Sequence, residues 1–142
     1  MTPETGGDDA SKTFSTASLG PMPIVNIEIV ASPNCGVAAG LAQALADVVG
    51  SALNSPPGNT WVRLRVLAQD NYAENAASLE SKDLPIFVTV LSRALPEGAD
   101  FVRTIAALTT SIADVTGRNP SRVHIEYAPA AAGRLSFGGN VV

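Results

Sequence analysis

The chain has 142 residues, of which 46% are apolar and 15% charged. This balance suits one compact domain with a buried core and excludes a generally disordered protein. A net charge of −4 without any Lys/Arg cluster argues against a nucleic-acid partner, and a single cysteine, Cys35, excludes an internal disulfide and gives no zinc-ligand spacing.

The first segment, residues 1–21, consists mainly of small and polar residues. We expect it to be a flexible N-terminal extension, with one folded domain following over residues 22–142. The first twenty residues lack the charged and apolar regions of a signal peptide, and no apolar run is long enough to span a membrane. A cytoplasmic protein without a membrane partner is therefore the expectation.

The first predicted structural unit spans residues 23–67. Alternating apolar and polar residues predict a half-buried strand over Ile24–Val30. Apolar residues at steps of three and four then predict an amphipathic helix from about Cys35 to Leu53. After a loop rich in proline and glycine, a second strand is predicted over Trp61–Leu67.

A polar linker over residues 68–84 separates this unit from a second one, residues 85–142. The second unit is predicted to contain a strand over Ile86–Leu91 and a helix from about Glu97 to Thr116, which ends before Gly117. Its last long strand is predicted over Arg122–Ala128, and Ser136–Gly139 reads as a turn.

The two units are in register, because 62 residues separate Pro23 from Pro85 and 61 separate Val62 from Val123. A shared period over strand, helix, loop and strand indicates an internal duplication. Each unit should form two parallel strands joined by a right-handed helical crossover. The predicted fold is α+β, with duplicated β-α-β units forming a four-stranded sheet and two helices on one face. The other face then needs a partner.

Three short pieces of the sequence resemble the tautomerase superfamily in its fused two-unit form. They are Met22-Pro23-Ile24-Val25, Val90-Leu91-Ser92-Arg93 and Ser136-Phe137-Gly138-Gly139. Members of this superfamily include 4-oxalocrotonate tautomerase, 5-carboxymethyl-2-hydroxymuconate isomerase and malonate semialdehyde decarboxylase. The resemblance implies a tautomerase/MIF-like fold that assembles as a homotrimer. It also implies keto–enol proton transfer on a small unsaturated keto or enol carboxylate, with no metal and no organic cofactor.

In that superfamily the general base is the amine of an N-terminal proline, which the resemblance places at Pro23. A free α-amino group titrates near ~8, and nearby cations and desolvation lower its pKa toward neutrality. The nitrogen of an internal proline is an amide without basicity. Either translation begins at Met22 or a leader is removed, which exposes Pro23, or the extension is retained and Pro23 only opens a strand.

The resemblance also implies cations that bind the substrate carboxylate and stabilise an enolate. Arg63 matches the second-strand arginine of the superfamily, and Arg65 shares its strand face. Arg93 matches the carboxylate-binding arginine of the decarboxylase and dehalogenase branches, although Leu95 and Pro96 stand where those branches have a second arginine.

Four further residues are candidates for substrate binding. Tyr72 and Glu74 follow the second strand, where loops of this fold border the pocket, and could donate to an enolate oxygen and shuttle a proton. Phe137 matches a pocket-wall aromatic, and His124 takes the arginine position in the second unit. Decarboxylation or dehalogenation with the same proline base, and a non-catalytic role if Pro23 stays internal, are the alternatives.

Overall fold

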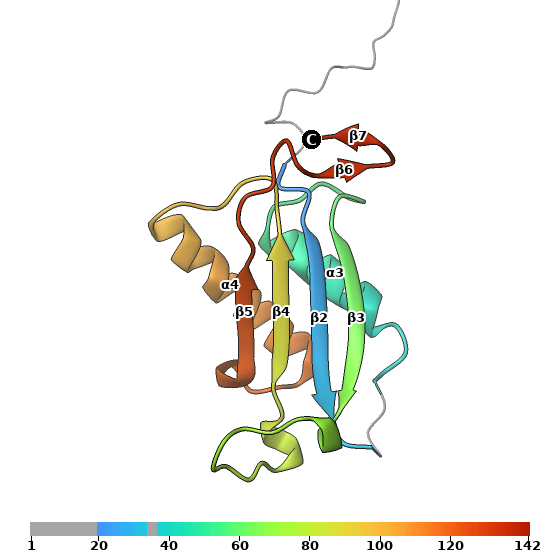
Figure 1. Cartoon of the computed structure of the whole chain (residues 1–142), viewed down its shortest axis with the longest axis vertical. Helices are drawn as coiled ribbons and strands as arrows, with labels where there is room; N and C mark the ends of the chain where they lie inside the picture. The colour runs from blue at the N-terminus through green and yellow to red at the C-terminus, as the bar shows by residue number, and fades with distance from the viewer. Residues whose placement is uncertain (1–19, 34–36) are drawn as a thin grey trace, which may run out of the picture.

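Four strands form one mixed sheet in the order β3–β2–β4–β5 (Figure 1). The computed structural model describes residues 20–33 and 37–142. The central pair, β2 and β4, is antiparallel, whereas β2 with β3 and β4 with β5 are parallel. The four strands are β2 (Ile24–Ala31), β3 (Trp61–Ala68), β4 (Ile86–Leu91) and β5 (Val123–Tyr127). This arrangement confirms the predicted pair of β-α-β units.

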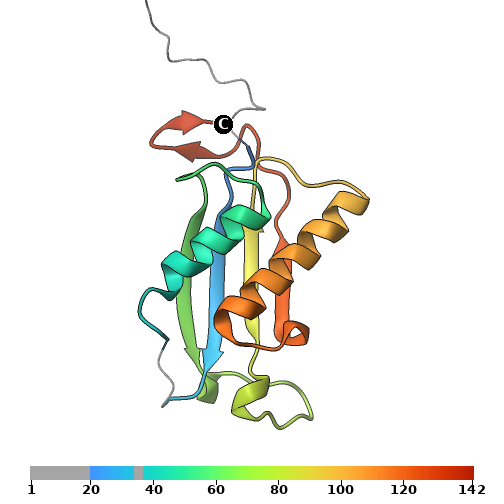
Figure 2. The same cartoon turned by 180° about the vertical axis from the view of Figure 1, so that it is seen from behind.

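Both long helices, α3 (Leu41–Ala52) and α4 (Ala99–Thr116), cover the same face of the sheet (Figure 2). The core lies between them and the sheet, because alternate strand residues point toward the helices. Its buried residues include Val25, Ile27, Leu45, Val49, Ile86, Val88, Leu108 and Ile112. Across the two described ranges, none of the helices is both long and apolar enough to cross a membrane.

Each helix begins later than the sequence pattern predicted. The first was expected from about Cys35, which lies outside the described residues, but α3 begins at Leu41. Gly40 precedes it in the left-handed conformation with φ of 82°, which cannot continue a right-handed helix backward. The second was expected from about Glu97, but Gly98, with φ of 55° and ψ of −125°, delays the start of α4 to Ala99. The predicted end before Gly117 is confirmed.

The two ends of the sheet carry different connecting segments. The upper end, as drawn in Figure 1, is where Ile24 pairs with Leu91, and the lower end is where Ile29 pairs with Ile86. A short hairpin of β6 (Ser136–Phe137) and β7 (Asn140–Val141) lies at the upper end. The predicted linker lies at the lower end and contains two short 3₁₀ helices, η1 (Gln69–Asn71) and η2 (Ser81–Asp83). A third, η3 (Pro120–Arg122), leads into β5.

The face of the sheet opposite the helices, called the open face here, carries two rows of mixed side chains. The strand register places Arg65, Glu28, Phe87 and His124 in one row. The next row contains Arg63, Asn26, Thr89 and Glu126. The aromatic side chain of Phe87 is 37% exposed on this face of the isolated chain.

Candidate active site at the upper end of the sheet

Pro23 stands at the upper end, immediately before β2, and its side chain is fully buried. Its carbonyl accepts a hydrogen bond of 3.0 Å from the backbone N–H of Trp61, which fixes it to the start of β3. Its nitrogen is part of the peptide bond with Met22 and has no basicity. In the intact chain Pro23 is therefore a strand-opening residue.

Residues Gly20–Met22, called the strap here, precede Pro23 and are held by the end of β4. The Ser92 hydroxyl and the Arg93 backbone N–H both donate to the carbonyl oxygen of Pro21, at 2.9 and 3.1 Å. The Arg93 guanidinium donates to the carbonyl oxygen of Gly20 at 2.8 Å. Ser92 and Arg93 are only 2% and 7% exposed. Three donors thus converge on two neighbouring oxygens beside Pro23, in the manner of an oxyanion-binding site.

A cavity of about 350 Å³ adjoins Ser92 on the helix side of the sheet. Gly20, Pro21 and Ser92 form one wall, and the cavity size falls in the range typical of small-molecule sites. Tyr127 lines it as well, and burial raises the pKa of its hydroxyl above the ordinary 10.0. The Tyr127 hydroxyl is therefore neutral at physiological pH and able to donate a hydrogen bond.

Phe137 also lies at the upper end, and its role as a pocket-wall aromatic remains a prediction. Its ring stacks on Trp61 with centroids 4.2 Å apart and planes inclined by 22°. This contact joins the β6–β7 hairpin to the first residue of β3. The hairpin is thereby positioned at the same end of the sheet as Pro23.

Arg63 and Arg65 do not reach the Ser92–Arg93 donors within the chain, because both project from the exposed strand β3 on the open face. Arg63 donates to the side-chain oxygen of Asn26 at 2.8 Å, and Arg65 lies opposite Glu28 in the register. Their predicted role in substrate binding remains a prediction, and it requires a second subunit to bring them to a site.

The structure places Tyr72 and Glu74 at the lower end, away from Pro23. The Tyr72 hydroxyl donates to the Glu74 carboxylate at 2.5 Å, and Arg122 pairs with the same oxygen. Hydrogen bonds from Tyr72 and Arg122 hold the pKa of Glu74 below its ordinary 4.5. Desolvation, followed by the hydrogen bond to Glu74, raises the pKa of Tyr72 above 10.0. In the isolated chain these residues form a satisfied polar network.

His124 lies in the same lower region, exposed on the open face. Its ring contacts Phe87 at a centroid distance of 5.4 Å, and Phe87 in turn contacts Tyr72 at 5.8 Å. Apart from Arg63 and Arg65 on β3, the site residues predicted from the sequence therefore fall into two groups at opposite ends of the sheet. Pro23, Arg93 and Phe137 lie at the upper end, and Tyr72, Glu74 and His124 lie at the lower end.

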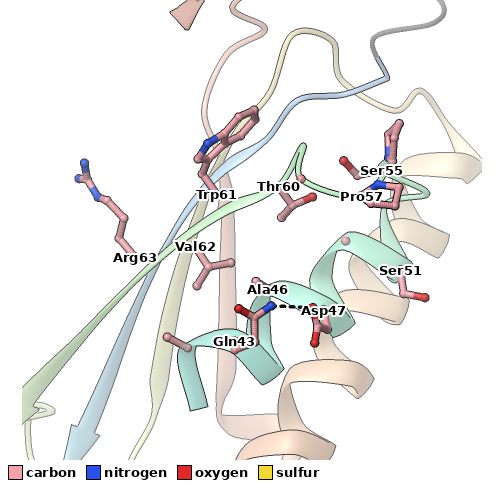
Figure 3. A pocket seen from close by; sticks show the side chains of 14 residues that line it. Gln43, Ala46, Asp47, Ser51, Ser55, Pro57, Thr60, Trp61, Val62 and Arg63 are labelled. Atoms are coloured by element: carbon pink, nitrogen blue, oxygen red, sulfur yellow. Dashed lines mark hydrogen bonds between the residues drawn. The ribbon is translucent and has the colours of Figure 1, made fainter. Parts of the chain in front are cut away.

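A larger hollow, of about 770 Å³, separates α3 from the edge strand β3 (Figure 3). Its polar side chains Gln43 and Asp47 hydrogen-bond to each other at 2.9 Å, and small residues form most of the remaining wall. Trp61 and Arg63 project from the other side of β3, away from the helix (Figure 3). Because the Ser92 and Arg93 donors lie elsewhere, we place the candidate site at the smaller cavity.

Ser92 and Tyr127 are the site residues that sequence reasoning missed. Ser92 stood within the Val90–Arg93 piece but was given no role, and Tyr127 lay within the predicted strand Arg122–Ala128 without one. Within residues 20–33 and 37–142, no three side chains of His, Cys, Asp or Glu gather closely enough to hold a metal ion. The upper end brings together the hydrogen-bond donors of Ser92 and Arg93, the guanidinium cation of Arg93 and Pro23.

Comparison with known proteins identifies the fold. No protein-family profile and no curated protein sequence matches the chain. Among solved structures, Pt0534 inactivated by 2-oxo-3-pentynoate is 18% identical, with 83% of this chain and 94% of that chain covered at a TM-score of 0.66. A fused 4-OT described as a symmetric trimer is 15% identical, with 83% and 94% covered at a TM-score of 0.63.

The FG41 malonate semialdehyde decarboxylase, inhibited by 3-bromopropiolate, is 22% identical, with 81% of this chain and 88% of that chain covered at a TM-score of 0.62. These neighbours are tautomerase superfamily members. The chain therefore has the tautomerase fold that its sequence pieces predicted.

Proposed function

We propose that the chain, when it begins at Pro23, is a tautomerase or isomerase that transfers a proton between carbon and oxygen of a small unsaturated keto acid. The observation that carries this proposal is the convergence of Ser92 and Arg93 donors on two oxygens immediately before Pro23. Loss of the residues up to Met22 would leave a secondary amine next to these donors. The tautomerase fold supports the same assignment.

The proton transfer follows from the properties of these groups. The Pro23 amine, with a pKa lowered by the nearby Arg93 cation and by burial, takes a proton from the carbon next to a carbonyl. The Ser92 hydroxyl and the Arg93 N–H stabilise the resulting enolate oxygen, and the guanidinium binds the carboxylate. The protonated amine then returns the proton to another carbon or to oxygen, so that no atom is gained or lost.

A homotrimer completes this proposal. The open face exposes Phe87 in the isolated chain, and one structural neighbour is described as a symmetric trimer. Packing three open faces together buries this residue and brings Arg63 and Arg65 to subunit boundaries, where they join the substrate site. Light scattering should give three times the chain mass, and Phe87→Lys should shift the protein toward monomer. A wild-type monomer would contradict the trimer.

Two other functions use the same scaffold. Decarboxylation needs the same proline base and carboxylate-binding arginine, and a malonate semialdehyde decarboxylase is among the structural neighbours. A non-catalytic binding or assembly role is favoured for the intact chain, because Pro23 is buried and its nitrogen is bonded to Met22. The terminal residue of the native protein decides between enzyme and binding protein.

The decisive experiment compares three chains: residues 1–142, residues 23–142 produced by removal of an initiating methionine, and the latter with Pro23→Ala. Phenylpyruvate tautomerisation should be found only in the second, with a loss of about 10²- to 10⁴-fold on Pro23→Ala. Intact mass of the native protein should show a species that begins at Pro23. Equal activity of all three chains would exclude Pro23 as the base, and a native species that retains residues 1–22 would favour the non-catalytic role.

A further inference from the structure

The strap makes contacts that an ordinary lead-in to a strand does not require. The carbonyl oxygens of Gly20 and Pro21 accept hydrogen bonds from a hydroxyl, a backbone N–H and a guanidinium of Ser92 and Arg93, two residues that are more than nine-tenths buried. It also forms a wall of the 350 Å³ cavity through Gly20 and Pro21. The strap therefore occupies the hydrogen-bond donors of Ser92 and Arg93 that the proposed reaction needs for its substrate.

The backbone of the strap is held in a conformation that Met22 disfavours. Met22 is 8% exposed and has a φ of 46°, a region that a long side chain rarely adopts. Gly20 has a φ of 65°, and a Cβ atom at this position would lie 3.2 Å from Cδ of Pro56. The hydrogen bonds from Ser92 and Arg93 thus hold the strap against its local preference.

We propose that the strap is an intramolecular competitor for the Ser92 and Arg93 donors, so that the intact chain binds a small carboxylate only when the strap moves away. The ligand class rests on the proposed function. A carboxylate oxygen of the ligand replaces the carbonyl oxygen of Gly20, and the oxygen of its adjacent carbonyl replaces that of Pro21. The rest of the ligand enters the cavity beside Tyr127.

The competition is one that a charged ligand can win. A carboxylate forms charge-assisted hydrogen bonds with a guanidinium, which are stronger than those of the neutral carbonyl of Gly20. The strap has the advantage of being part of the same chain, which gives it a high effective concentration. The apparent affinity of the intact chain is then the affinity of the open site reduced by the fraction of molecules in which the strap is displaced.

Gly20→Ala in the full-length chain tests this proposal, because the new methyl group contacts Pro56 and the positive φ becomes unfavourable. Gly40→Ala is the matched control: its φ is 82°, nothing lies within 4 Å of its Cβ, and it precedes α3 outside the proposed site. Phenylpyruvate is the probe, titrated by calorimetry and by NMR. Hydrogen exchange at the Arg93 amide, which donates to Pro21, reports strap opening.

We expect Gly20→Ala to accelerate exchange at the Arg93 amide and to tighten phenylpyruvate binding about tenfold, while Gly40→Ala matches wild type in both. Arg93→Ala in the Gly20→Ala background should abolish binding, which locates the probe. Accelerated exchange without tighter binding would overturn the proposal. Exchange at the Arg93 amide could instead be unchanged both in Gly20→Ala and in the double variant Gly20→Ala with Met22→Ser. The strap would then not open, and the proposal would be excluded as well.

This test is independent of the proline base, because the full-length chain has no free amine at Pro23. Competition by the strap can hold even if the chain that begins at Pro23 shows no tautomerase activity. Conversely, an active chain beginning at Pro23 together with unchanged binding in Gly20→Ala would leave the proposed function in place and remove the competitor.

Discussion

At each end of the sheet, side-chain donors hold the backbone carbonyls that precede a strand-opening proline. At the upper end, Ser92 and Arg93 hold the strap, whose residues lie at the start of the described chain. At the lower end, Arg122 donates to the carbonyl of Asp83 at 2.7 Å, and Arg118 donates to that of Leu84 at 2.8 Å. Both ends thus use the same mode of anchoring, although the donors follow β4 at the upper end and lie between α4 and β5 at the lower end.

The difference lies in what the anchored segment can do. The lower segment, Asp83–Leu84, connects the rest of the linker to β4, so it cannot leave without unfolding its neighbours. Arg122, which holds it, is also bound to the Glu74 carboxylate. The upper segment is the strap, and its removal together with the residues before it would free the Ser92 and Arg93 donors beside the amine of Pro23. The same arrangement therefore closes the linker at the lower end, whereas at the upper end it forms the basis of the proposed site.

The largest expected effect compares the residues that directly precede the two prolines. Leu84 is 1% exposed, and Leu84→Ala should lower the free energy of unfolding by about 2–5 kcal/mol. Met22→Ala should lower the free energy of unfolding by less, because Met22 has a positive φ and belongs to the strap, which we propose can move away from Ser92 and Arg93. Urea denaturation of the two full-length variants checks this. Equal losses would show that the strap is as integral to the fold as the lower segment.

The next effect concerns the arginines of the two ends in the chain that begins at Pro23. Arg93→Ala should lower kcat/KM for phenylpyruvate by about 10- to 100-fold, since a hydrogen bond to a charged group is lost in the transition state. Arg118→Ala removes a comparable contact to a carbonyl at the lower end, and kcat/KM per folded molecule should stay within about threefold. A similar loss in both variants would mean that the effect is one of folding and not of substrate binding.

The lower network predicts a dependence of stability on pH. The folded-state pKa of Glu74 is lowered by Tyr72 and Arg122, so its stabilising contribution is present above the ordinary value of 4.5 and is lost as pH falls through the lowered value. Glu74→Gln lacks this contribution at neutral pH. The melting temperatures of wild type and variant should therefore differ at pH 7 and converge as the pH falls through the lowered pKa of Glu74. A difference that grows on acidification would contradict the pKa direction.

The fold was predictable because duplication, alternation and helical spacing all pointed to the same architecture. The helix starts were not, because only the backbone geometry shows that Gly40 and Gly98 leave the right-handed helical region. For the site, the sequence named Pro23 and Arg93 as candidates, and the structure places them at one end because the antiparallel pair brings the start of β2 next to the end of β4.

The lower group shows where prediction from the sequence stopped. Tyr72 and Glu74 follow β3. Because β3 runs parallel to β2, it ends at the end of the sheet far from Pro23. These two residues were predicted from their place in a loop that borders the pocket in this fold, and that prediction did not say at which end of one chain the loop would lie. Ser92 was missed for a different reason: a serine beside an arginine has no distinctive pattern until its acceptor, the carbonyl of Pro21, is seen.

The smallest expected effect tests whether the β6–β7 hairpin belongs to the upper end in solution. Trp61 is the only tryptophan of the chain, so its fluorescence reports the stacking of Phe137 directly. Phe137→Ala should shift its emission to the red and destabilise the chain by about 0.5–1.5 kcal/mol beyond the loss of buried area. Phe87→Ala, which removes a ring contact at the lower end, should leave the emission unchanged. An unshifted spectrum for Phe137→Ala would mean that the hairpin does not cover Trp61, and the upper end would then lose an aromatic wall.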